Sequence, residues 1–123
     1  MSGERYKIKF IIPNLGEAVG ELERTRGPHL TEMLVRALPI QSRGLLRDGM
    51  FFIPVSVLYA IEKPFTSANR GDIVYEANSK GLMILLETKT FDNKIAKIGR
   101  ITRNLELFEK IRRSAGVKIE KLI

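Results

Sequence analysis

The sequence predicts a mainly β protein, a closed antiparallel barrel of about eight strands with two helices capping its ends. Most patterned segments are short strands separated by Gly, Pro, Asn and Asp turns, and only two segments show helical spacing. One run, Leu82–Leu86, is apolar at every position, which is typical of a strand buried on both faces. A doubly wound sheet would instead alternate strand and helix throughout. With 123 residues and 44% apolar content, residues 1–123 are expected to form one domain.

The first elements are two strands and a helix. Residues 6–12 alternate between apolar and polar, which predicts a half-buried strand, and residues 13–16 form a turn. Residues 17–23 predict a second strand that turns Glu17, Glu21 and Glu23 towards water, as an edge strand would. Residues 28–38 carry an apolar stripe at helical spacing. This helix begins at a proline and ends before another.

A hairpin and a long loop follow. Residues 40–46 and 50–57 predict two strands around the Asp48–Gly49 turn. Pro54 cannot donate a ladder hydrogen bond, so its strand is expected to lie at an edge or to bulge. The extended chain is expected to continue to residue 61. Residues 62–70 have little pattern and predict a loop.

The last elements would close the barrel. Residues 73–75 and 82–86 predict strands, and a helix is expected to cover the outer face of the second. Residues 88–93 predict a turn and residues 94–101 a strand. Asn104 is expected to cap a second helix that ends at Gly116 and buries Leu105, Phe108, Ile111 and Ala115. Residues 117–122 predict the final strand.

Composition excludes several classes of chemistry. The chain has no cysteine, so disulfides, thiolate zinc sites and cysteine nucleophiles are excluded, and a reducing cytoplasm is the expected compartment. No apolar run reaches the roughly 18 residues that a membrane span needs, and no signal peptide is evident. The abundance of Lys, Arg, Glu and Ile, with a single glutamine, is compatible with a thermophilic source.

The sequence contains no recognisable catalytic, metal or cofactor motif, and no cofactor or metal is expected. The only histidine, His29, follows Pro28 at the start of a helix, where an exposed polar residue is ordinary. The three glutamates of residues 17–23 could hold a hard cation, but a solvated strand explains them better.

The chain resembles the atypical prokaryotic cyclophilin-like proteins, which keep the cyclophilin barrel without its usual sequence. The segments that carry this likeness are residues 38–42, 49–55, 71–75 and 98–101, followed by a helix and a closing strand. The resemblance implies a cyclophilin-like barrel. It also suggests peptidyl-prolyl isomerase activity as a function to consider. However, the F-M-x-Q-G-G strand is missing and the chain has no tryptophan, so no catalytic residue can be carried over.

Candidate binding residues come from arginines and aromatic residues. Prolyl isomerisation needs an apolar pocket and a donor to the imide nitrogen, which an arginine beside aromatic rings could supply. Arg43 and Arg47 share one face of the strand that precedes Phe51 and Phe52, and Phe51 could join that face if the hairpin places it there. Aromatic residues near turns could meet a ligand at the barrel mouth. The predicted ligand-binding set is Arg43, Arg47, Phe51, Phe52, Phe65 and Tyr75. The alternative is that the rings form the core.

Three functions remain open at this point. The first is a peptide or small-ligand binding module, monomeric or homodimeric, without the usual isomerase site. The second is a peptidyl-prolyl isomerase with a divergent site, so whether the protein is an enzyme is open. The third is a nucleic-acid-associated module, because residues 89–123 carry 10 basic and 4 acidic side chains. It is disfavoured because Glu106 and Glu109 each precede a basic residue by one helical turn.

Overall fold

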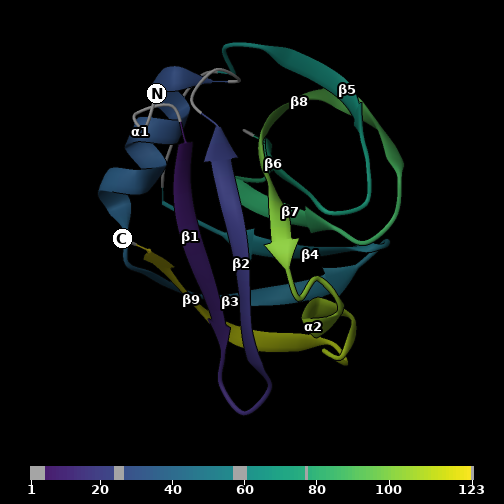
Figure 1. Cartoon of the computed structure of the whole chain (residues 1–123). Coiled ribbons are helices and arrows are strands. Elements are labelled where there is room, and N and C mark those ends of the chain that lie inside the picture. The colour runs from purple at the N-terminus through teal and green to yellow at the C-terminus, as the bar shows by residue number, and fades with distance from the viewer. Residues whose placement is uncertain (1–4, 24–26, 57–60, 77, 123) are drawn as a thin grey trace.

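The computed structural model describes residues 5–23, 27–56, 61–76 and 78–122. The chain forms nine strands and two helices in this part (Figure 1). The strands are β1 (Arg5–Ile12), β2 (Gly16–Glu23), β3 (Ile40–Arg47), β4 (Met50–Pro54), β5 (Pro64–Ala68), β6 (Asp72–Glu76), β7 (Gly81–Leu85), β8 (Lys89–Arg103) and β9 (Ser114–Lys121). The helices are α1 (Pro28–Ala37) and α2 (Glu106–Glu109).

Eight of the strands close into an antiparallel barrel, as predicted. Their order is β2-β1-β9-β3-β4-β7-β6-β8, and β8 pairs back to β2 to complete the circle. The ninth strand, β5, lies outside this circle and pairs with β8. Because β2 has a partner on both sides, the prediction that its glutamates lie on an edge strand is wrong. Their side chains nevertheless face outwards, while Ala18, Gly20 and Leu22 face inwards.

The barrel interior is filled by side chains and is closed at opposite ends by the two helices (Figure 1). Leu30 and Leu34 of α1 enter the core at one end, and Leu107 and Phe108 of α2 enter it at the other. The Phe108 ring packs against two further phenylalanines, with centroid distances of 5.7 Å to Phe10 and 5.5 Å to Phe51. Burial of these apolar side chains is the main source of stability.

A second hydrophobic cluster lies on the outer surface of the barrel. Along β7, Leu82 and Ile84 point into the barrel, whereas Met83 and Leu85 point outwards and are also buried. The prediction that β7 is buried on both faces is therefore confirmed. A helix was expected to cover the outer face of β7, and this is wrong. β5 and the first part of β8 arch over this side instead (Figure 1). Their contribution to the cluster is Ala68, Ile95, Phe65 and Phe91.

Two segments that were predicted to be a loop and a turn form the covering strands instead. β5 occupies the predicted loop, and β8 runs for 15 residues through the predicted turn at residues 88–93. The two strands pair with each other from Pro64–Ala96 to Ala68–Lys89, with an irregularity between Phe65 and Ser67. The strand predicted at residues 94–101 is confirmed as part of β8. The apolar residues of β5 and of the first part of β8 are too few and too widely spaced for sequence periodicity to reveal these segments, which depend on their pairing.

The second helix is much shorter than predicted. α2 ends at Glu109, and the chain enters β9 at Ser114, so Ala115 and Gly116 are strand residues. Asn104 does not cap the helix with its side chain, because its amide nitrogen donates to the carbonyl oxygen of Glu17 at 2.8 Å. The backbone of Asn104 is left-handed, with φ 65°. Pairing of β9 with β3 and β1 therefore competes successfully with helix propensity.

In the segment after β4, Val55 and Ser56 are not in a strand, and residues 57–60 of the predicted extended stretch lie outside the described residues. Among the residues that the structure describes, no helix combines the length and the apolar character needed to cross a membrane.

Candidate functional site

The hairpin of β3 and β4 is regular near its turn and splits at its far end. Asp48 and Gly49 both have positive φ, 49° and 75°, as a two-residue hairpin turn requires. The strands pair from Arg47–Met50 to Leu45–Phe52 and no further. The turn prediction is therefore confirmed, but the first half of β3 has no ladder to β4.

Pro54 explains where the ladder stops. Backbone N–H groups alternate sides along a strand, and the Val55 N–H donates to Lys80 on the β7 side at 3.1 Å. The nitrogen of Pro54 therefore faces β3, where the next pair in register would be Arg43–Pro54. Because proline has no N–H, it cannot donate to the carbonyl of Arg43. The expectation that the strand of Pro54 lies at an edge or bulges is therefore wrong, because β4 has neighbours on both sides and pairs with β7 in regular register; instead, the ladder to β3 ends before Pro54.

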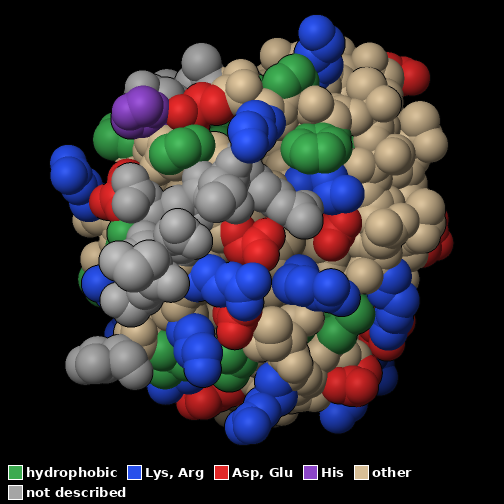
Figure 2. All heavy atoms as spheres, turned by 45° about the horizontal axis from the view of Figure 1, so that its top comes forward, with side chains coloured by type: hydrophobic (Ala, Val, Ile, Leu, Met, Phe, Trp, Pro, Cys, Tyr) green, Lys and Arg blue, Asp and Glu red, His purple; other side chains and the backbone are tan. Residues whose placement is uncertain are grey.

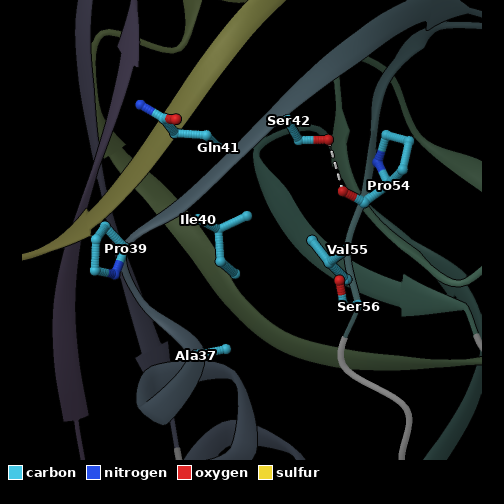
Figure 3. Close-up of a pocket in the computed structure, with 8 residues that line it drawn as sticks. All are labelled: Ala37, Pro39, Ile40, Gln41, Ser42, Pro54, Val55 and Ser56. Carbon is cyan, nitrogen blue, oxygen red and sulfur yellow. Dashed lines mark hydrogen bonds between the residues drawn. The ribbon is translucent and has the colours of Figure 1, made fainter.

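A side-chain bond spans the split. The hydroxyl of Ser42 donates to the carbonyl oxygen of Pro54 at 2.7 Å, drawn as the dashed line in Figure 3. This bond joins the two walls at one point without restoring the ladder. It also satisfies a carbonyl that a neighbouring strand would otherwise satisfy.

The separated strands enclose a cleft of about 600 Å³. One wall comes from the end of α1 and the start of β3, and the other from the end of β4 and the two residues after it (Figure 3). The lining residues are Ala37, Pro39, Ile40, Gln41, Ser42, Pro54, Val55 and Ser56. The volume lies in the range typical of small-molecule sites, about 300–1,000 Å³.

The chemistry of this cleft is neutral. Its lining among the described residues contains no charged side chain and neither of the predicted arginines. Ile40 and Val55 supply apolar surface, and Ser42 and Ser56 supply hydroxyl groups. In Figure 3 the Gln41 side chain points away from the β4 wall, and it also borders a second hollow of about 260 Å³ beside Lys118. The described lining can therefore bind and orient a ligand, and it includes no acid–base pair.

The structure separates the six predicted ligand-binding residues. Phe51 and Tyr75 lie inside the barrel, with exposures of 0% and 1%, so these rings face the core and not a groove. It is Phe52 that shares the outer face with Arg43 and Arg47, because Phe52 pairs with Leu45. The Arg47 guanidinium lies 4.7 Å from the centre of the Phe52 ring.

Phe65 is partly buried and packs against the second cluster, which also contains Phe52, so the structure brings these two predicted rings to one hydrophobic cluster. The Nζ atom of Lys97 lies 5.0 Å from the centre of the Phe65 ring. Phe65, which was expected in a loop near the barrel mouth, lies in β5, where it covers apolar side chains.

The cleft residues were not identified from the sequence. The signal that could have found them is Pro54 within an otherwise pairable strand, because proline has no N–H and leaves a carbonyl of the opposite strand without its backbone donor. Ser42 is the residue able to bridge that position with its side chain.

The only histidine has a structural partner. The Glu62 carboxylate accepts the backbone N–H groups of His29 and Leu30, each at 3.0 Å, and lies 2.7 Å from the Nδ1 atom of His29. Burial raises the pKa of the Glu62 carboxyl. The contacts with the backbone N–H groups and with His29 together lower the pKa by more than burial raises it, so the pKa lies below its ordinary value. Glu62 thus occupies the position of a capping residue for α1.

No cluster of three or more His, Asp or Glu side chains able to hold a metal ion occurs within the described ranges. The outward glutamates of β2 are instead placed against basic residues of β1, with Arg5 3.7 Å from Glu21 and Lys9 3.8 Å from Glu17.

Comparisons with known proteins identify the fold. No family model matches the chain, and no curated protein matches it. The hypothetical protein AF2241 from Archaeoglobus fulgidus superposes with a TM-score of 0.78 at 16% identity, covering 97% of this chain and 96% of that one. McbB, solved in complex with tryptophan, superposes with a TM-score of 0.75 at 13% identity over 92% of this chain. This chain spans 44% of the McbB chain, so the barrel corresponds to part of a larger protein there.

Proposed function

We propose that this protein is a binding module that holds a peptide or small ligand in the cleft between β3 and β4. The observation that supports this most strongly is the interruption of a closed barrel wall at Pro54, which leaves a cleft of about 600 Å³. Elsewhere β3 is paired to β9 along Ile40 to Leu45, so the opening is confined to one side of the strand.

We propose a neutral, amide-bearing ligand such as a short peptide segment. A cation or anion would lose hydration in a cleft where the lining residues that the structure describes offer it no opposite charge. An amide N–H of a ligand could instead donate to the hydroxyl oxygen of Ser42 or Ser56, which both line the cleft. Apolar atoms would contact Ile40 and Val55. The bound tryptophan named for McbB makes amino-acid derivatives a reasonable first class of probes.

The test is a binding titration with neutral probes, N-acetyl amino-acid N-methylamides, followed by amide chemical shifts. Shift changes are expected at residues 40–43 and 54–56, and Ala37→Phe, which places a ring in the cleft, is expected to abolish them. Met33→Phe is the matched control, because Met33 is 41% exposed on the same helix and does not line the cleft. Shift changes that survive Ala37→Phe, or that map elsewhere, would contradict the proposal.

Isomerase activity remains the second proposal, and it has less support. It requires an arginine facing an apolar pocket, whereas Arg47 lies over the outer ring of Phe52 and Arg43 does not line the cleft. If a proline-peptide assay did detect activity, its loss in Arg43→Ala or Arg47→Ala would favour isomerisation at the outer face.

We also propose that the barrel is cyclophilin-like and that it works in the cytoplasm. Eight strands closed around a packed interior with a helix at each end support the first. A chain without cysteine supports the second. A proteome fractionation that finds the protein in an oxidising compartment would contradict the latter.

A further inference from the structure

The outer surface of the barrel shows two different treatments of positive charge. Around β2, basic residues lie beside glutamates: Arg5 is 3.6 Å from Glu23, Lys9 is 3.8 Å from Glu17, and Arg100 is opposite Glu21 in the β2–β8 register. The face in Figure 2 accordingly shows basic and acidic side chains interleaved. Basic charge around β2 is thus largely offset by these glutamates.

The face built from β3 and the start of β9 is different. Arg43 and Arg47 point outwards from β3. The Arg113 carbonyl accepts the Leu46 N–H at 2.7 Å, so the β3–β9 register continues to this residue and places Arg112 opposite Arg47 on the outer face. We call Arg43, Arg47 and Arg112 the arginine face. In the part of the chain that the structure describes, no ion pair includes any of them.

Two carboxylates lie near the arginine face, Asp48 in the hairpin turn and Glu87, whose side chain packs over Gly49 of the same turn. Neither forms an ion pair with an arginine of the face among the described residues. Asp48 follows Arg47 in the hairpin turn, and its carbonyl accepts Lys89, which brings a further cation to that turn. Glu120 of β9 is 3.0 Å from Lys118, its neighbour on the same strand. Like charges gathered on adjacent strands destabilise a sheet, so the folded state does not explain this arrangement.

Two further features suggest what binds there. Leu45 lies between Arg43 and Arg47 on the same face and is 45% exposed, one of the few large apolar side chains on the surface. Opposite Arg43, Gly116 leaves open space above the sheet, because a Cβ at Gly116 would meet nothing within 4 Å. The face therefore offers cations around an apolar centre, with room for a chain to approach.

We infer that the arginine face docks an acidic segment of a protein partner, with carboxylates on the arginines and an apolar side chain on Leu45. Arginine pairs with carboxylates through two parallel hydrogen bonds. Alternate residues of an extended chain are about 7 Å apart, which matches the spacing of Arg43, Leu45 and Arg47 along β3. A nucleic acid fits less well, because Leu45 has no counterpart in a phosphate backbone and Phe52, at 7% exposure, offers no stacking surface.

The experiment uses a synthetic peptide of about ten residues in which glutamates alternate with leucine or alanine, a length that spans the face. Binding to the full chain is measured by titration at two salt concentrations. Arg43→Gln with Arg112→Gln is expected to weaken it by about tenfold or more, and Leu45→Ser to weaken it at both salts. The matched control is Arg5→Gln with Lys9→Gln, which removes equal charge from the glutamate-paired face and is expected to leave affinity within about twofold.

Three outcomes would overturn the inference. They are an absence of binding by the acidic peptide, equal weakening by the control pair, and tighter binding of a DNA duplex of matched length than of the peptide. The arginine face lies outside the cleft, so this test is independent of the neutral-ligand titration.

Discussion

Ser42 and Pro54 are joined by a side-chain hydrogen bond of 2.7 Å at the position where a backbone pair would otherwise stand. This single contact holds the mouth of the cleft, because the β3–β4 ladder ends at Leu45 and Phe52. The cleft therefore owes its existence to a missing donor at residue 54, and its width to the bond from Ser42.

Restoring the donor is expected to close the cleft. In Pro54→Ala the new N–H can donate to the Arg43 carbonyl and extend the ladder by one pair. We expect the amide at position 54 to be protected from hydrogen exchange and the affinity for neutral amide probes to fall. An exchange rate like that of an exposed amide would contradict this account of the split.

The pH dependence of stability should reveal Glu62. Its pKa is lower in the folded state than the ordinary value of 4.5, so its contribution is complete well above that pH. The contribution is lost as the pH falls from 4.5 through the folded-state pKa. Glu62→Gln is expected to cost about 1 kcal/mol at pH 7 and less near pH 3. Denaturant unfolding of both proteins at these two pH values measures the difference, and an equal difference at both would refute it.

Thr31 is expected to be a site where a substitution stabilises the fold. Its side chain is fully buried in α1, and its hydroxyl oxygen has no hydrogen-bond partner within the described residues. Thr31→Val keeps the shape and removes the unsatisfied group, so the free energy of unfolding should rise by about 1 kcal/mol. Thr31→Ser, which keeps the hydroxyl and removes a methyl group, is the control and should destabilise.

Two glycines on paired strands should respond differently to the same change. A Cβ at Gly44 would lie 2.2 Å from the Cζ atom of Phe51, inside the packed core. Gly44→Ala is therefore expected to cost about 1–3 kcal/mol. Gly116→Ala enters open space and should be neutral or stabilising by a few tenths, about 0.5 kcal/mol at most. Thermal unfolding of both variants gives the comparison, and similar effects would show that Phe51 can move aside.

The barrel could be predicted because its signals are local. Alternation in β1, the turn at Asp48–Gly49 and the apolar run of β7 each depend on neighbouring residues, and each is present in the structure. β5 could not be predicted, since Phe65 and Ala68 become strand residues only through pairing with β8. α2 was overestimated because apolar spacing continues past Glu109, while the chain already turns towards β9.

The site could be predicted only in part, because side-chain direction depends on register. A hairpin shifted by one residue would have exchanged Phe51 and Phe52, and the sequence does not decide between them. The observed register places Phe51 inside and Phe52 under Arg47. The register of β6 likewise decides the direction of Tyr75, whose side chain lies in the core. Predicting the cleft from the sequence would have required two facts: which strand lies opposite Pro54, and towards which neighbouring strand the nitrogen of Pro54 faces.

The strap made by β5 and the start of β8 is attached to the outside of a barrel that is already closed. Its seal is the small outer cluster around Met83 and Phe52, which shares no residue with the interior cluster. Detaching this strap would expose one hydrophobic patch but would break none of the pairings between the eight barrel strands. The amides of β5 should therefore exchange with solvent through local unfolding of low free energy, whereas those of β1 and β9 should exchange only through complete unfolding.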